Sequence, residues 1–156
     1  MTDFNDLLTP EAVLSGAPVG NKKKLFARIG EAAAEAYGLD AALVTERLSA
    51  REKLGSTGFG GGIAIPHGKI ADLPGVMGVF VQLDRGIEFA AVDDAPVDLV
   101  FALFSPPDAG AEHLKALARV SRRLRDRNFT AKLRGAASSD ALYALLTGVE
   151  ARDAAA

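Results

Sequence analysis

The chain has 156 residues, 49% of them hydrophobic, and a formal net charge of -2, which suits one domain with an ordinary hydrophobic core. It contains no cysteine, so disulfide scaffolds, thiolate nucleophiles and cysteine-ligated zinc are excluded. The nearly balanced charge gives no general attraction for nucleic acid or for an anionic membrane. Any binding must therefore occur at a local site.

Residues 1–6 are acidic and lack the basic and apolar regions of a signal peptide, so we expect no export. The longest purely apolar run, residues 99–104, is far shorter than the roughly 20 residues of a membrane-spanning helix. We expect a cytoplasmic protein without membrane insertion. Residues 1–156 are predicted to form a single domain, with its core over residues 4–148 and a short tail at residues 151–156.

The first part of the chain has helical patterns. A threonine followed by Pro10 predicts a short helix or turn over residues 10–14. Apolar residues then recur at helical spacing over residues 21–38, from an asparagine cap to a glycine. A second helix is predicted from the Asp40 cap to about residue 55.

The middle of the chain has the character of a sheet. Residues 56–62 form a glycine-dense loop, and a short β-prone run after it is closed by Pro66-His67-Gly68. Two longer runs are apolar on both faces, as in buried central strands. The predicted strands are residues 63–65, 76–83, 97–104 and, as a short extra strand, 87–89.

The last part is helical again, over residues 112–125, residues 129–134 and a final helix to Thr147, capped by Ser139 or Asp140. Along one face of the first of these helices lie His113, Leu117, Val120 and Leu124. The order of helices, strands and helices predicts a sheet covered on both faces, a three-layer α/β/α sandwich.

The chain has two histidines, the side chains whose charge changes near neutral pH without a large pKa shift. His67 follows an apolar strand, where open α/β sheets place functional loops, although a turn histidine without a role fits equally well. His113 lies on an apolar helix face, and these residues by themselves favour a partly buried histidine with no chemical role.

Other kinds of site are poorly supported. The glycine loop does not match the Walker pattern, because Ile63 and Ala64 follow its last glycine. It does not match the dinucleotide pattern either, because Ile63 stands at the third-glycine position and the loop precedes a strand. The basic residues between 115 and 127 are better read as a solvated helix face than as a nucleic-acid site. Two histidines without a nearby acidic motif do not make a zinc site, and the chain has no Gly-x-Ser-x-Gly motif of a serine hydrolase.

A long motif spans residues 51–69, with the sequence REKLGSTGFGGGIAIPHGK. It resembles the phosphorylation-site segment of IIA proteins of the phosphoenolpyruvate-dependent phosphotransferase system. Residues 78–83, 95–103 and 113–124 resemble the sheet and the second-histidine helix of the same family. Within the fructose/mannitol IIA superfamily, the amino-acid sequence is most similar to the nitrogen-regulatory IIA-Ntr branch, over about residues 4–148.

The resemblance implies a mixed central sheet between helical layers and a phosphoryl group carried on His67. The donor would be the HPr-like carrier NPr, charged from phosphoenolpyruvate by enzyme I-Ntr. His113 and Arg51 would border the phosphoryl site, and Thr57 and nearby loop N–H groups would be able to bind phosphoryl oxygens. The residues leave the phosphorylated ring nitrogen open, and the resemblance favours the tele position. No nucleotide, metal or other cofactor is required.

The resemblance also implies regulation through the phosphorylation state, with partners such as potassium-uptake proteins or sensor kinases. Two alternatives stay open. One is a sugar-transport IIA component that passes its phosphoryl group to a separate IIB protein. The other is an interaction module in the IIA fold that has lost phosphorylation, although His67 in a complete motif argues against it.

Overall fold

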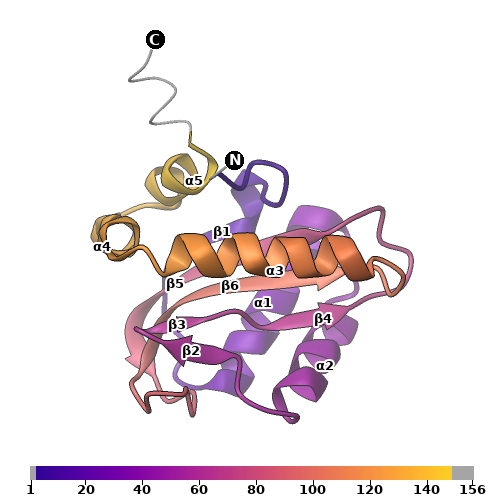
Figure 1. The fold of residues 1–156 in the computed structure, drawn as a ribbon, viewed down its shortest axis with the longest axis horizontal. Coiled ribbons are helices and arrows are strands. Elements are labelled where there is room, and N and C mark those ends of the chain that lie inside the picture. The colour runs from indigo at the N-terminus through magenta and orange to yellow at the C-terminus, as the bar shows by residue number, and fades with distance from the viewer. Residues whose placement is uncertain (1–2, 149–156) are drawn as a thin grey trace.

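The computed structural model describes residues 3–148 (Figure 1). No helix in this range is both long enough and apolar enough to cross a membrane. The tail predicted at residues 151–156 lies outside the described residues. The helical elements are η1 (Pro10–Ala12), α1 (Lys22–Tyr37), α2 (Ala41–Glu52), α3 (Gly110–Leu124), α4 (Arg127–Gly135) and α5 (Ser139–Thr147). The strands are β1 (Val13–Ala17), β2 (Gly58–Gly60), β3 (Ile63–Ala64), β4 (His67–Lys69), β5 (Met77–Ile87) and β6 (Val97–Ser105).

The strands of residues 3–148 form one mixed sheet in the order β1-β5-β6-β3-β2, and β4 also pairs with β6. β5 and β6 are antiparallel, β1 is parallel to β5, and both β3 and β4 are parallel to β6. The side chains of β6 are buried, apart from the partly buried Asp98, because helices cover both faces of the sheet. The two long apolar runs thus form the centre of the sheet, as predicted.

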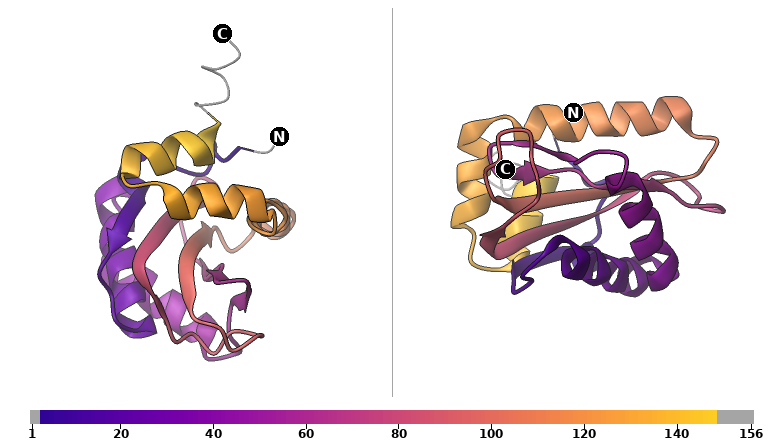
Figure 2. Two further views of the ribbon diagram at one scale, coloured as in Figure 1. Left: turned by 90° about the vertical axis from the view of Figure 1, so that its left-hand side faces the viewer. Right: turned by 90° about the horizontal axis from the view of Figure 1, so that it is seen from below.

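Helices lie on both sides of this sheet, as Figure 2 shows in its side views. α1 packs against β5 and α2 against β4, whereas α3 packs against β6 from the other side. α5 contacts β1 and η1 near the end of the sheet where the N-terminal segment lies (Figure 1). The predicted three-layer α/β/α sandwich with a mixed sheet is confirmed.

Local capping determines several helix ends as the sequence predicts. The Asn21 side chain accepts a hydrogen bond from the Lys24 amide at the start of α1, and Asp40 caps α2 in the same way. The cap predicted for the last helix is wrong by one residue. Ser138 caps α5, accepting from the Ala141 amide at 3.1 Å. In a run of adjacent polar residues, helix geometry selects the residue three positions before a free amide.

The structure also corrects the strand predictions. The helix predicted over residues 10–14 is wrong after Ala12, because Val13 and Leu14 begin β1 and pair with Phe80 and Val81 of β5. A separate strand at residues 87–89 is also wrong, since Ile87 is the last residue of β5. The glycine loop contains the short strand β2, which pairs with β3. Each difference arises from strand pairing, with a distant strand for β1 and with the next strand along the chain for β2 and for the end of β5.

Candidate functional site

The sequence suggests that His67 lies in a turn, but in the structure it is the first residue of strand β4. It lies opposite Leu103 of β6, and the Leu103 amide donates to the carbonyl of Pro66 at 2.9 Å. Helix α2 crosses β4 closely at the next residue, where a Cβ on Gly68 would lie 3.1 Å from the Cβ of Arg47. This close approach brings the last turn of α2 beside His67.

The half-buried imidazole of His67 is held by a backbone carbonyl. Its Nδ1 lies 3.0 Å from the oxygen of Ile65, and because a carbonyl only accepts, Nδ1 carries the proton. Nε2 therefore presents its lone pair, which accepts a hydrogen bond from Nε of Arg51 at 3.2 Å. Burial lowers the pKa of His67 and outweighs the hydrogen bond to the Ile65 carbonyl, which raises it; the Arg51 charge lowers the pKa further and Glu52 raises it. The ring is thus a neutral imidazole with a nucleophilic Nε2.

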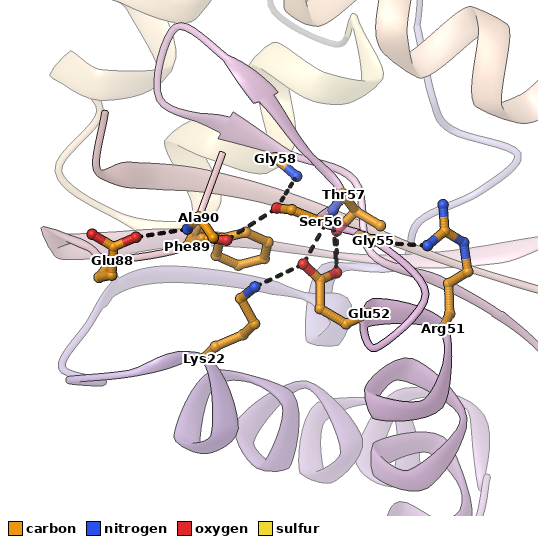
Figure 3. Close-up of polar contacts among 10 residues, drawn as sticks. All are labelled: Lys22, Arg51, Glu52, Gly55, Ser56, Thr57, Gly58, Glu88, Phe89 and Ala90. Atoms are coloured by element: carbon orange, nitrogen blue, oxygen red, sulfur yellow. Dashed lines mark hydrogen bonds and ion pairs between the residues drawn. The ribbon is translucent and has the colours of Figure 1, made fainter. Parts of the chain in front are cut away.

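Arg51 lies in the last turn of α2 and joins His67 to the following loop. Its Nη1 donates to the carbonyl of Gly55 at 2.9 Å (Figure 3). Gly55 has a φ of 153°, a conformation that other residues rarely adopt, so a glycine is needed to present this carbonyl. A guanidinium has five N–H donors, so Arg51 retains donors for an anion bound at Nε2 of His67.

His113 approaches His67 from helix α3, on the other side of the sheet from α2. The centres of the two imidazole rings are 5.4 Å apart, and His113 is buried, with 7% of its surface exposed. Its Nδ1 contacts the hydroxyl of Ser105 at 2.5 Å. Burial lowers the pKa of His113, and the nearby His67 and Lys69 lower it further.

Three of the predicted site residues, His67, His113 and Arg51, therefore come together from a strand and two helices. The predicted helix face packs against the core: His113, Val120 and Leu124 are buried and Leu117 is partly buried. Ala116 is also buried on this helix.

Comparison with known proteins decides the family. A profile described as "Phosphoenolpyruvate-dependent sugar phosphotransferase system, EIIA 2" matches residues 6–149. The chain belongs to this EIIA family. It is 48% identical over 143 residues to a nitrogen regulatory protein of Bradyrhizobium diazoefficiens, covering 92% of this chain and 94% of that protein.

Solved structures agree with this membership. The nitrogen regulatory protein IIA-Ntr of Neisseria meningitidis matches with a TM-score of 0.84 and 36% identity, over 91% of this chain and 97% of that chain. The mannitol IIA protein of Escherichia coli matches with a TM-score of 0.75 and 26% identity, over 90% and 99% of the two chains. By homology this EIIA protein belongs to the nitrogen-regulatory branch, so the predicted family is confirmed. Membership makes it a component of a phosphotransfer system.

The EIIA motif also contains a buried acid that the sequence analysis missed. The Glu52 side chain is 6% exposed and pairs with Nζ of Lys22 at 2.8 Å. It also accepts from the hydroxyl of Thr57 at 2.6 Å and from the Thr57 amide at 3.1 Å (Figure 3). Lys22 lies 4.2 Å from the centre of the Phe89 ring. Glu52 thus ties the loop after α2 to the start of α1 and anchors the turn that carries Arg51.

A neighbouring serine continues this anchorage. The Ser56 hydroxyl donates to the carbonyl of Phe89 at 3.0 Å and accepts from the amide of Gly58 at 3.1 Å. The loop is thus held by two neighbouring residues: Thr57 contacts Glu52, and Ser56 contacts the carbonyl of Phe89. A glutamate directly after Arg51 at a helix end is the sequence signal for this arrangement, but its lysine partner is not visible from spacing.

The role predicted for Thr57 is not supported by its contacts here. Its hydroxyl and amide both donate to Glu52, so neither is free for a phosphoryl oxygen in this structure. The amide of Gly61 likewise donates to Asp93 at 3.0 Å. Phosphoryl binding by Thr57 stays a prediction, and Arg51 has the better geometry.

Two of the basic side chains of α3, Arg119 and Arg123, have structural partners. Arg119 forms an ion pair with Asp6 at 2.7 Å, which fastens the N-terminal segment to the helix. The guanidinium of Arg123 lies 3.7 Å from the centre of the Phe129 ring and 3.3 Å from Asp126, the cap of α4. These two arginines therefore help to hold neighbouring segments, whereas Arg122 is exposed.

The arrangement around His67 suits transfer of an anionic group between nitrogen atoms. It combines a neutral nucleophilic nitrogen, a guanidinium and a second neutral imidazole. Within residues 3–148 there is no group of three or more His, Asp or Glu side chains arranged to hold a metal ion.

Proposed function

We propose that this protein accepts a phosphoryl group on Nε2 of His67, the tele nitrogen, from a phosphohistidine of the HPr-like carrier NPr. Enzyme I-Ntr charges that carrier from phosphoenolpyruvate. The proposal rests on one observation above all. The Ile65 carbonyl holds Nδ1–H of His67, and the free lone pair of Nε2 lies beside the Arg51 guanidinium.

The transfer step needs no base. The Nε2 lone pair attacks phosphorus in line, a new N–P bond forms, and the N–P bond of the carrier breaks with its electron pair returning to the carrier imidazole. The proton on Nδ1 of His67 stays in place. The Ile65 carbonyl continues to accept from it and stabilises the positive charge that the ring gains on transfer.

The protein contributes mainly position and charge. Arg51 turns its donors from the bare nitrogen to the phosphoryl oxygens, while the neighbouring His113 supplies a further donor. A unit-charge contact at ~4 Å and an effective dielectric near 20 contributes about 4 kcal/mol before desolvation. Arg51 is therefore the residue whose loss slows transfer most, apart from the acceptor itself.

Regulation follows from the added charge. A phosphoryl group brings up to about two negative charges to a partly exposed site, which changes a docking surface without a change of fold. The higher identity to nitrogen regulatory proteins than to the mannitol protein favours regulation over sugar transport. The proposed partners are potassium-uptake proteins or sensor kinases, and the proposed compartment is the cytoplasm, with its phosphoenolpyruvate.

Intact-protein mass spectrometry tests the proposal after incubation with phosphoenolpyruvate, enzyme I and the HPr-like carrier. We expect one acid-labile phosphoryl increment on the wild type and none on His67→Ala. Glu46→Gln, on the exposed side of α2, is the control and should be labelled like the wild type. Labelling of His67→Ala, or no labelling of the wild type while another acceptor is labelled, would overturn the assignment. Rapid passage of the label to a IIB protein would favour the sugar-transport alternative.

A further inference from the structure

Ser105 lies behind His113 at the end of strand β6. It is fully buried, and its carbonyl accepts from the Ile70 amide at 2.9 Å, so the sheet fixes its position. Its hydroxyl lies 2.5 Å from Nδ1 of His113. Among the residues that the structure describes, this is the one hydrogen-bond partner of the Ser105 side chain, and Nε2 of His113 has none.

The contact has two possible directions, and counting donors separates them. If Nδ1–H donated to the serine oxygen, the buried hydroxyl hydrogen would have no acceptor within residues 3–148. Nε2 would then carry a lone pair toward an anionic group. If the hydroxyl donates to Nδ1, the serine hydrogen and the Nδ1 lone pair are both satisfied, and the ring proton is on Nε2.

We propose that Ser105 is a positioning residue: its hydroxyl donates to Nδ1 of His113 and holds that ring in the Nε2-protonated tautomer, so that His113 donates a hydrogen bond to the phosphoryl group on His67. The second part rests on the proposed function, whereas the tautomer itself does not. The two histidines thus have opposite tautomers because their partners differ. A carbonyl, which only accepts, faces Nδ1 of His67, and a hydroxyl faces Nδ1 of His113.

The surroundings of His113 support a neutral donor. Burial and the charge of the nearby Lys69 lower its pKa, so the ring stays uncharged near neutral pH and offers Nε2–H without adding a charge. The ring centres of His67 and His113 are 5.4 Å apart, which leaves a phosphoryl oxygen on Nε2 of His67 within reach of His113. A neutral imidazole that donates from Nε2 binds the phosphoryl oxygens of both the incoming and the bound group.

Long-range proton–nitrogen NMR correlation on the 15N-labelled protein tests the tautomer directly. The chain has only two histidines, and His67→Gln assigns their signals. We expect Nδ1 of His113 to give the signal of an unprotonated nitrogen and Nε2 that of a protonated one. Ser105→Ala should produce a mixture of tautomers. A wild-type His113 protonated at Nδ1 would overturn the proposal, as would a tautomer unchanged in Ser105→Ala.

A matched pair of variants separates hydrogen bonding from packing. Ser105→Thr keeps the hydroxyl, and Ser105→Val has nearly the same shape without it. We expect the threonine variant to transfer phosphate at close to the wild-type rate. The valine and alanine variants should transfer about tenfold more slowly, as expected for one hydrogen bond lost in the transition state. Circular dichroism confirms that each variant is folded.

A double variant connects the effect to His113. Ser105→Ala should slow transfer in the wild type but not further in His113→Gln, since the ring through which Ser105 acts is then absent. Equal rates for the valine and threonine variants, or fully additive losses in the double variant, would refute positioning through His113. If His67 accepts no phosphoryl group at all, the proposed function fails, while the NMR result still decides the tautomer.

Discussion

Replacing Glu52 tests whether its buried network stabilises the segment that carries Arg51. Glu52 has a side chain 6% exposed and three donors around it: the Lys22 ammonium and the hydroxyl and amide of Thr57. Glu52→Ala removes the shared acceptor and leaves all three donors without it. Glu52→Gln keeps an amide oxygen for the Thr57 hydroxyl but removes the charge.

The expected loss of stability follows from these contacts. A hydrogen bond to a charged acceptor contributes about 1.5–3 kcal/mol, and the two bonds from Thr57 share one carboxylate, so together they contribute about 2 kcal/mol. The ion pair adds about 1 kcal/mol, because the Lys22 side chain is 27% exposed and water can hydrate it when the acid is removed. Glu52→Ala should therefore lower the free energy of unfolding by about 3 kcal/mol, and Glu52→Gln by about 1–2 kcal/mol.

Urea unfolding followed by circular dichroism measures these losses, with an unchanged dependence on urea as the check on two-state behaviour. Lys22→Met combined with Glu52→Gln isolates the ion pair, for which we expect a coupling energy of about 1 kcal/mol. Glu46→Gln is the control at an exposed glutamate of the same helix and should change stability by less than about 0.5 kcal/mol. A loss below about 1 kcal/mol for Glu52→Ala would refute the reasoning.

Other expectations concern the site and helix α3. Arg51→Gln should slow phosphoryl transfer to His67 by about 100-fold, because the charge contact of up to about 4 kcal/mol is partly offset by desolvation. Rapid-quench kinetics measure the rate of transfer. A rate within about threefold of the wild-type rate contradicts the prediction. The pKa of His67 is lowered from its ordinary 6.5, so an NMR titration should find a midpoint below that value. As the pH falls below 6.5 the unfolded state binds this proton first, so stability decreases, and transfer slows as Nε2 becomes protonated in the folded state. Arg123→Ala should cost about 1 kcal/mol, since the guanidinium stacks on Phe129, whereas the exposed Arg122→Ala should leave urea unfolding unchanged.

Much of the fold is predictable where local chemistry decides it. Asn21 and Asp40 mark helix starts because their side chains bond to amides two or three residues later. The runs that form β5 and β6 are recognisable because strands covered on both faces are apolar at most positions, without a polar residue at every second one. Strand β1 was missed because Val13–Ala17 is short and follows a proline turn, and its pairing with β5 joins segments far apart in the chain.

The candidate site is likewise predictable only in part from the sequence. The motif of residues 51–69 identifies His67 and Arg51 and leads to the family, because both residues lie in one continuous segment of the sequence. It does not reveal the tautomer of His67, which depends on the position of the Ile65 carbonyl. The motif also does not reveal that the hydroxyl of Thr57, one of its own residues, donates to Glu52.

The sequence by itself determines the caps of α1 and α2, the central strands, the family and the histidine at the centre of the proposed chemistry. Only the tertiary structure decides which side chains meet: Arg51 with His67, Glu52 with Lys22, and Ser105 with His113. The physical reason is that capping depends on bonds between near neighbours. These three contacts depend instead on how β4 and β6 align and how α1, α2 and α3 pack, which no local pattern of residues encodes.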